Sequence, residues 1–268
     1  MKQYLEMLDY VLTKGKQKAD RTGTGTLTVF DYTLKFDMGE GFPLVTTKKM
    51  HLKSIIHELL WFLRGEQYID YLQANGVTIW DEWAAENGHV GPIYGWQWRK
   101  WRDYANDNKI DQITELISSI KNNPNSRRQL VSAWNVADLP SMKLPPCHFA
   151  FQCQVMDGKL NMKVFMRSLD IFLGAPFDIA SYAFLLHMLA EQTNLIPGIF
   201  VLTATDVHLY NNHIEQAKLQ LTRTPLSLPY WHKVKSIPKD IDSYTFDYLN
   251  YAIYGYLSHP AIKAPIAV

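Results

Sequence analysis

Cys147 is the residue whose surroundings point most clearly to chemistry. It follows Leu144-Pro145-Pro146, and the aromatic and apolar run from His148 to Val155 predicts a strand directly after it. The two prolines restrict the backbone before the thiol and remove two backbone donors. A thiol at the start of a rigid strand is a candidate nucleophile. The competing interpretation is a buried, inert cysteine, because free cysteine often packs as a small apolar residue.

His148 is the nearest base to this thiol in the sequence. Adjacent residues of a strand point to opposite faces of the sheet, so His148 is poorly placed to take the Cys147 proton. The chain also has no Gly-x-Ser-x-Gly nucleophile elbow. A cysteine hydrolase therefore remains only an alternative.

Arginines near turns and strand ends predict an anion site. Arg21 lies in a glycine-rich loop, Arg127 and Arg128 precede a predicted strand, and Arg167-Ser168 end another. Together they could bind one phosphate dianion through bidentate guanidinium contacts. Each arginine taken alone is more simply a solvated surface residue. A cationic cluster beside Cys147 would lower the pKa of the thiol and favour the thiolate.

Glu58 is the candidate for proton transfer. It lies on a predicted helix among apolar residues, where desolvation would raise the pKa of its carboxyl group. The alternative is a glutamate on the solvated face of that helix. Apolar residues recur at helical spacing through the segment, at Leu52, Ile55, Ile56, Leu59, Leu60 and Leu63.

The composition limits the classes of protein to consider. The chain has 268 residues, of which 47% are hydrophobic, and its net charge is +1 from 27 basic and 26 acidic residues. This balance gives no overall attraction to nucleic acid or to an anionic membrane. The two cysteines suit neither a disulfide framework nor a zinc site, so we expect no metal. With no signal peptide and no apolar span, we expect a cytoplasmic protein.

The elements that must position these residues follow from periodicity and turn signals. We expect a helix at the start of the chain, around residues 4–12, and a strand over 27–36. A helix over 52–63 should end near Arg64-Gly65, and residues 75–108 should be irregular. Further on we expect helices over 110–120 and 177–195 and a helix ending at 221. The expected strands are 129–134, 148–156, 159–167 and 200–210, with a tight turn at Asp157-Gly158 and proline-interrupted strands after residue 221.

This order mixes strand runs with helices and lacks regular strand–helix alternation. It therefore predicts an α+β fold. The length allows one large core, and we see no repeat, low-complexity tract or linker. We expect a single catalytic domain over residues 1–268.

Ordered motifs along almost the whole chain resemble those of thymidylate synthase, the folate-dependent family with a cysteine nucleophile. They begin with Asp20-Arg21-Thr22-Gly23-Thr24-Gly25, the segment 42–49 and His57-Glu58-Leu59-Leu60-Trp61-Phe62. They continue with the segments 78–83, 91–95, 126–128 and 132–135, Pro146-Cys147-His148, Arg167-Ser168, 170–174, 206–210 and the terminal Ala264-Pro265-Ile266-Ala267-Val268. The resemblance implies that family's α+β fold, with a large mixed sheet packed with helices and one sheet face forming a homodimer interface.

The resemblance also implies a mechanism. Cys147 would add to C6 of a pyrimidine nucleotide, and C5 would take the one-carbon unit of 5,10-methylenetetrahydrofolate before hydride reduction to a methyl group. Protons would be moved by Glu58, Tyr94 and His148. The phosphate would contact Arg21, Arg167 and Ser168, with Arg127 and Arg128 donated by the second subunit. The ribose hydroxyl would contact His208 and Tyr210, and the folate would contact Lys48, Lys49, His51, Trp80, Trp83, Asp170, Gly174, Phe177 and Val268.

Asp178 is the main departure from the family's pattern, which has an asparagine at this base-reading position. An asparagine amide accepts from uracil N3–H and donates to O4, and a carboxylate cannot donate to O4. Cytosine reverses the pattern, and burial would favour a protonated Asp178 that shares its proton with N3. We therefore expect dCMP rather than dUMP as substrate, with Asp178 and Asp170 both near the nucleotide. Met166, Leu169 and Thr205 also depart from the family, without indicating a direction.

The alternatives to dCMP methylation concern product, substrate and class. Water could trap the intermediate to give a dCMP 5-hydroxymethylase, but Trp80 and the C-terminal tail, which would exclude water, are retained. The substrate could instead be dUMP, with aspartate tolerated. A non-enzymatic RNA-binding role is disfavoured by the balanced charge and by the intact Cys147, Glu58 and Arg167. Modified dCMP is useful mainly for modified DNA, which suggests a bacteriophage origin and location in the host cytoplasm.

Overall fold

A six-stranded mixed sheet organises the chain. The computed structural model describes residues 1–232, 234 and 236–266. The strand order is β1-β2-β8-β7-β6-β5, and β7 and β8 are parallel while the other neighbours are antiparallel. The strands are β1 (Lys16–Lys18), β2 (Thr26–Asp37), β5 (Leu130–Ser132), β6 (His148–Met156), β7 (Lys159–Asp170) and β8 (Ile196–Tyr210). The expected α+β fold with a large mixed sheet is confirmed.

Local sequence signals explain how the central strands connect. The β6–β7 hairpin turns at Asp157 and Gly158, whose φ values of 50° and 73° are both positive, as a tight two-residue hairpin turn requires. The chain then returns through α6 (Gly174–Thr193), a helix buried on nearly all sides that ends at Asn194 in the left-handed conformation. Because the connection is a helix rather than a hairpin, β8 runs parallel to β7.

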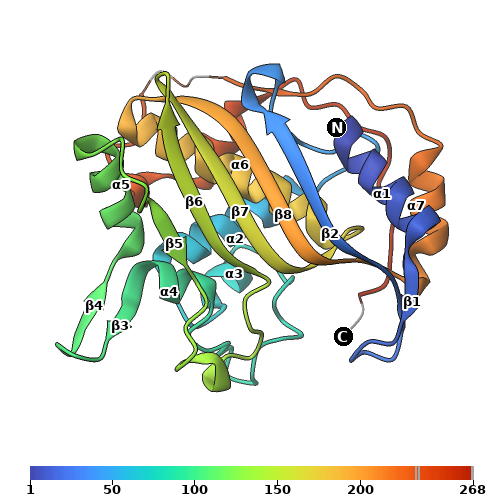
Figure 1. Cartoon of the computed structure of the whole chain (residues 1–268), viewed down its shortest axis with the longest axis horizontal. Helices are drawn as coiled ribbons and strands as arrows, with labels where there is room; N and C mark the ends of the chain where they lie inside the picture. Colours follow the sequence, from blue (N-terminus) through green and yellow to red (C-terminus); the bar gives the residue numbers. More distant parts are fainter. Residues whose placement is uncertain (233, 235, 267–268) are drawn as a thin grey trace.

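Helices cover one face of the sheet. In Figure 1, α2 and α6 lie behind the strands, whereas α1 and α7 lie beside β2 at one edge. One contiguous cluster of buried apolar side chains runs through these layers. The other helices, in chain order, are α1 (Lys2–Lys14), α2 (Leu52–Arg64), α3 (Asp70–Ala74), α4 (Tyr94–Lys100), α5 (Gln112–Asn122), α7 (Ile214–Leu221) and α8 (Phe246–Ala252).

Short elements complete the fold. Two small hairpin-like pairs are β3 (Trp101–Asp103) with β4 (Asn108–Ile110), and β9 (Tyr230–Trp231) with β10 (Ile253–Tyr254). Four 3₁₀ turns are η1 (Met38–Glu40), η2 (Leu139–Ser141), η3 (Asn211–His213) and η4 (Ile241–Ser243). Among the helices of the described residues, none combines the length and apolarity needed to cross a bilayer.

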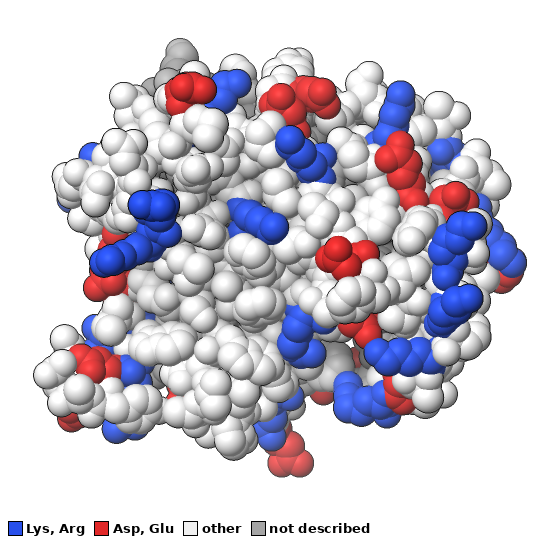
Figure 2. All heavy atoms as spheres, viewed as in Figure 1, with Lys and Arg blue, Asp and Glu red and all other residues white. Residues whose placement is uncertain are grey.

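The front face of the sheet has little charge. Within the described part of the chain, no helix lies over the strands in the view of Figure 1. Figure 2 shows the same face, on which charged side chains stand singly among uncharged ones. Exposed or half-buried residues on these strands include Phe165, Val201 and the hydrogen-bonded pair Thr33 and Thr203. This face is therefore a broad, weakly charged surface.

Two expectations about secondary structure were wrong. Residues 75–108 are not all irregular, since they contain α4 and β3; α4 carries Gly95, and a Cβ there would lie 2.1 Å from the Phe62 carbonyl oxygen of α2. This helix is stabilised by packing on α2, which no local pattern reveals. After residue 221 the described chain is mostly loop with η4 and α8, and its strands β9 and β10 have two residues each. The Thr245 side chain accepts from Tyr248 N–H and so caps α8.

Candidate active site

Cys147 lies directly before β6, as expected. Its N–H donates to the hydroxyl oxygen of Tyr94 at 2.9 Å, and its carbonyl accepts from the Arg167 N–H of β7 at 2.9 Å. The Arg167 Nη2 atom lies 3.5 Å from the Cys147 Sγ atom. The thiol is thus fixed between α4 on one side and β7 on the other.

The proline pair before the thiol orients Arg167. Its Nε atom donates to the Pro146 carbonyl at 2.9 Å, and its Nη2 atom donates to the Pro145 carbonyl at 2.7 Å. Prolines keep this backbone extended, so both carbonyls point to one guanidinium. Arg167 therefore presents a fixed positive charge to Cys147.

The expected low pKa of Cys147 is wrong for the protein on its own. Burial raises the pKa of the thiol, and the nearby charge of Arg167 opposes this without reversing it. Of the four predicted arginines, Arg167 contacts the thiol, whereas Arg21, Arg127 and Arg128 are exposed on this chain. One guanidinium offsets only part of the cost of desolvating a thiolate.

Glu58 occupies the desolvated position that its helix pattern predicts. Burial raises the pKa of its carboxyl group to about 7. Its Oε1 atom accepts from the Trp80 Nε1–H at 2.7 Å, which partly opposes this rise. A carboxyl group with a pKa near neutrality can both accept and release a proton under physiological conditions.

His148 is held as a neutral imidazole. Burial lowers its pKa to about 3. Its Nδ1 atom lies 2.8 Å from the Tyr182 hydroxyl, and its ring stacks on Tyr94 with centroids 4.1 Å apart. Burial also raises the pKa of both tyrosines well above the usual value, so their hydroxyls stay protonated. His148 faces this aromatic group and not the Cys147 thiol.

Asp178 is a second acid in the candidate site, and its side chain is 19% exposed. Burial raises the pKa of its carboxyl group well above the usual range, and the negative charges of Glu58 and Asp170 raise it further. Its Oδ1 atom lies 3.8 Å from His148 Nε2, which is too long for a direct hydrogen bond. Because His148 is neutral, it supplies no positive charge to stabilise an ionised Asp178. The protonated form of Asp178, which the sequence predicts, is therefore favoured.

The paired ends of β7 and β8 bring the remaining predicted nucleotide residues together. Ser168 lies opposite Asp206, and Asp170 lies opposite His208. His208 is buried, with 8% of its surface exposed, and its ring is 5.2 Å from that of Tyr210. Because both strands end at the same edge of the sheet, these side chains lie in one row.

A family comparison accounts for this constellation. The family model for thymidylate synthase matches residues 2–268. The chain belongs to the thymidylate synthase family. It is therefore a one-carbon methyltransferase, which methylates C5 of a pyrimidine nucleotide with methylenetetrahydrofolate as co-substrate.

The residues that thymidylate synthase similarity assigns to folate differ in burial. Trp80 is buried, whereas Trp83, Gly174 and Phe177 are half-buried. Asp170 is oriented because its Oδ1 atom accepts from the backbone N–H groups of residues 172 and 173. Val268 lies outside the described residues. Flat apolar side chains beside an oriented carboxylate suit a flat heteroaromatic ring with polar edges.

The three predicted contacts to the folate glutamate differ in exposure. Lys48 is buried, its Nζ atom donates to the Phe172 carbonyl, and burial lowers its pKa to about 8. Lys49 and His51 are exposed, and the His51 Nδ1 atom lies 2.7 Å from Ser54 Oγ at the start of α2. The exposed pair is free to meet a carboxylate from solvent, whereas Lys48 supports the loop behind the cavity.

Sequence reasoning missed Tyr182 and Asp206. Tyr182 lies four residues after Asp178 on α6, so the two share a helix face, and this spacing was the available signal. Asp206 hydrogen-bonds to His208 two residues later on the same strand face, which an alternating strand pattern also predicts. In the described residues, no group of three or more His, Cys, Asp or Glu side chains is placed to bind a metal ion.

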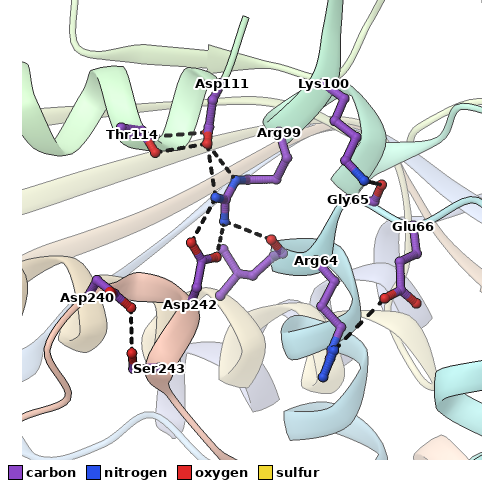
Figure 3. A network of polar contacts seen from close by, with 11 residues as sticks. Arg64, Gly65, Glu66, Arg99, Lys100, Asp111, Thr114, Asp240, Asp242 and Ser243 are labelled. Atoms are coloured by element: carbon purple, nitrogen blue, oxygen red, sulfur yellow. Dashed lines mark hydrogen bonds and ion pairs between the residues drawn. The ribbon is translucent and has the colours of Figure 1, made fainter. Parts of the chain in front are cut away.

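Outside the cavity, Arg99 joins the helices that carry Glu58 and Tyr94. Its guanidinium donates to the Leu63 carbonyl at the end of α2 at 2.8 Å and to Asp242 of η4 at 2.6 and 3.1 Å, and it pairs with Asp111 at 2.9 Å (Figure 3). Its side chain is 11% exposed. This network fixes α4 against α2 and α5.

A separate cleft lies on the opposite side of α2 from Glu58. Its volume is about 600 Å³, and its lining includes Lys53, His57, Arg64, Tyr71 and Phe246. None of the predicted nucleotide or folate residues lines it. The cleft is therefore not the site of the one-carbon transfer.

Proposed function

We propose that the protein converts dCMP to 5-methyl-dCMP within a single catalytic domain. The observation that carries the proposal is Asp178, whose side chain is 19% exposed and faces a neutral His148 at 3.8 Å, at the position where the family resemblance implies the base-reading side chain. Burial and the charges of Glu58 and Asp170 keep its carboxyl group protonated. The family assignment supports C5 methylation of a pyrimidine nucleotide in general, and Asp178 supports the choice of cytosine.

The choice of base depends on the proton of Asp178. A neutral carboxyl group has one donor and one acceptor, so it can hydrogen-bond to either pyrimidine edge. Cytosine N3 is a base, and it can take the proton from Asp178 while N4–H donates to the other carboxylate oxygen. The result is a bidentate charge-assisted pair, which is stronger than a neutral one. Uracil has no basic N3 and gains no such pair.

The same proton would activate the base for attack. Protonation at N3 withdraws electrons from C6, where the Cys147 Sγ atom would add. Arg167, 3.5 Å from Sγ, would stabilise the negative charge of the attacking sulfur. Glu58, with a pKa of about 7, would hold and release protons near the ring, and Tyr94 would act as a donor because its hydroxyl stays protonated.

Methylation rather than hydroxymethylation requires a dry cavity. When bound, methylenetetrahydrofolate supplies the one-carbon unit and the hydride. Trp80, Trp83 and Phe177 would hold it, with Lys49 and His51 near its carboxylates. Trp80 is only 6% exposed and is fixed by its hydrogen bond to Glu58, so it would keep water from the reacting carbon.

A homodimer through the open sheet face completes the proposal. The family is typically dimeric. The front of the sheet is weakly charged and lies beneath no helix of the described residues (Figures 1 and 2), which supports its use as the interface. Arg127 and Arg128 lie just before β5 and are exposed, so they are available to reach the phosphate site of a partner subunit.

The test is a substrate competition. Purified protein would be incubated with methylenetetrahydrofolate and equal dCMP and dUMP, and products would be identified by mass spectrometry. We expect dCMP to gain one methyl group, and we expect Asp178→Asn to reverse the preference toward dUMP by at least about tenfold. Asp103→Asn, a half-buried acid in β3, is the matched control.

Other products would contradict specific parts of the proposal. Methylation of dUMP alone by the wild-type protein would overturn the role of Asp178 in choosing cytosine. A gain of a hydroxymethyl group would overturn the dry-cavity argument for Trp80. Turnover without folate would overturn the proposed one-carbon transfer altogether.

A further inference from the structure

Three side chains form a hydrogen-bonded chain beside the predicted sugar site. The Asp206 Oδ1 atom lies 3.0 Å from His208 Nδ1, and the Lys18 Nζ atom lies 2.5 Å from Asp206 Oδ2. Lys18 belongs to β1 and reaches across β2 to Asp206 on β8. His208 is 8% exposed, whereas the Lys18 side chain is 59% exposed. The chain therefore runs from the solvent to the sugar-side imidazole.

This geometry determines which ring nitrogen of His208 carries a proton. Hydrogen bonds from His208 and Lys18 lower the pKa of Asp206 to about 2, so Asp206 is a carboxylate at neutral pH. A carboxylate only accepts hydrogen bonds, so His208 must donate from Nδ1. In the neutral imidazole, Nε2 then has no proton and is an acceptor.

An acceptor at this position matches the free hydroxyl of a deoxynucleotide. A 2′-deoxynucleoside 5′-monophosphate has one sugar hydroxyl, at the 3′ position. This hydroxyl can donate its proton to an unprotonated Nε2. An Nε2–H group could only donate to the hydroxyl oxygen, and the hydroxyl proton would then need another acceptor. The row of Ser168, Asp170, Asp206 and His208 along paired β7 and β8 places this nitrogen at the predicted nucleotide site.

We infer that Asp206 and Lys18 are positioning residues that hold His208 in the Nδ1–H form, so that its Nε2 accepts the 3′-hydroxyl of the substrate. The inference rests on the proposed function, together with the sugar contact that the family resemblance implies for His208. Lys18 acts only by holding Asp206. Its effect is smaller, because its charge is largely solvated.

The structural alternative is that these contacts only hold two strands of the sheet together. In that case Asp206 and Lys18 would only join β1 to β8, and their removal would lower stability without changing how the protein distinguishes sugar hydroxyls. Protein stability alone therefore cannot decide, and a readout specific to the 3′-hydroxyl is required.

The first experiment compares nucleotides with and without that hydroxyl. Dissociation constants for dCMP and 2′,3′-dideoxy-CMP, and for the matching uridine pair, would be measured by calorimetry. We expect wild-type protein to prefer the 3′-hydroxyl by about tenfold with the base it accepts, and Asp206→Asn to reduce this preference to about twofold or less. Lys18→Met should reduce it about twofold to threefold. Lys218→Met, which removes an exposed ion pair with Glu215 of the same kind, should leave it unchanged.

The second experiment reads the proton directly. The ¹⁵N chemical shifts of the His208 ring in labelled protein distinguish Nδ1–H from Nε2–H, with His208→Gln providing the assignment. We expect Nδ1–H in wild-type protein and a mixture in Asp206→Asn. Nε2–H in the wild type, or an unchanged 3′-hydroxyl preference in Asp206→Asn, would overturn the inference. Because the shifts are measured without nucleotide, this arm decides about Asp206 even where the protein fails to bind dCMP and the proposed function fails.

Discussion

Two groups of carboxylates in this molecule differ in what compensates them. Asp111 and Asp242 both contact the Arg99 guanidinium at the junction of α2, α4 and α5 (Figure 3). Glu58 and Asp178 lie in the cavity beside Cys147, where burial and their mutual repulsion raise the pKa of Asp178 and burial raises that of Glu58 to about 7. Acids of one chemical type thus pair with a guanidinium in one region and have raised pKa values in the other.

The difference separates two uses of an acidic side chain. A carboxylate held by a guanidinium stabilises a junction and has no proton to give. A buried carboxyl group without a cation costs stability when it ionises, but its proton is available near neutral pH. The network at Arg99 supports the backbone positions from which Glu58 and Tyr94 act, so the first region makes the second possible.

Replacing Glu58 should produce the largest effect. Glu58→Gln keeps the size of the side chain but removes its proton transfer, so kcat should fall about 1000-fold. Glu66→Gln, a half-buried acid just after the same helix, should change kcat less than about twofold. Steady-state kinetics with the accepted nucleotide would measure both. A loss below about tenfold for Glu58→Gln would show that the cavity acid does not move the proton.

The pH dependence of stability should give the next largest effect. The folded pKa of Glu58 is about 7, above its ordinary value of 4.5. Below pH 4.5 the Glu58 carboxyl group is protonated in both the folded and the unfolded state, so it does not change the free energy of unfolding. As pH rises to 7 the unfolded chain releases this proton before the folded protein does, so the free energy of unfolding falls. Relative to wild type, Glu58→Gln should therefore gain about 3 kcal/mol between pH 4 and pH 8.

Urea denaturation across this pH range would measure that gain. Glu66→Gln should show a constant difference from wild type over the same range. A Glu58→Gln difference that does not change with pH would mean that Glu58 is solvated and belongs with the compensated acids.

Removing the cation of the paired region should give the smallest of the three effects. Arg99→Leu removes the cation that Asp111 and Asp242 share and should lower the free energy of unfolding by about 2 kcal/mol. This value is below that of a fully buried pair because Asp242 is 61% exposed.

Arg102→Leu is the matched control, since the Arg102 and Asp107 atoms are 3.9 Å apart and both side chains are exposed. It should cost less than about 0.5 kcal/mol in the same urea titration. Equal losses of unfolding free energy in Arg99→Leu and Arg102→Leu would mean that the Arg99 network stabilises the protein no more than an ordinary surface ion pair.

Sequence patterns predicted the parts of the fold that local chemistry determines. The Asp157-Gly158 turn, the end of α2 at Gly65 and the desolvation of Glu58 all follow from residues close in sequence. The helix α4 was missed because its short segment is stabilised by α2, more than 30 residues away. After residue 221 the described strands are limited to the two-residue β9 and β10, since η4 and α8 occupy part of the segment.

For the site, the sequence names candidate residues, but it does not determine how they are ionised. Resemblance identified Cys147 and Arg167, but the thiol pKa depends on the balance between burial and one guanidinium, which requires coordinates. Lys48 was expected at the folate, and its burial against Phe172 is visible only in three dimensions. Tyr182 and Asp206 were detectable from spacing once their neighbours were known to act.

Gly95 sets the distance between the two proton-handling side chains. A methyl group at this position would lie 2.1 Å from the Phe62 carbonyl oxygen, so any other residue would force α4 away from α2. Glu58 and Tyr94 would then separate although neither had changed. In a redesign of this enzyme for a new base, the side chains that face the nucleotide can be varied, whereas Gly95 behind them must be kept.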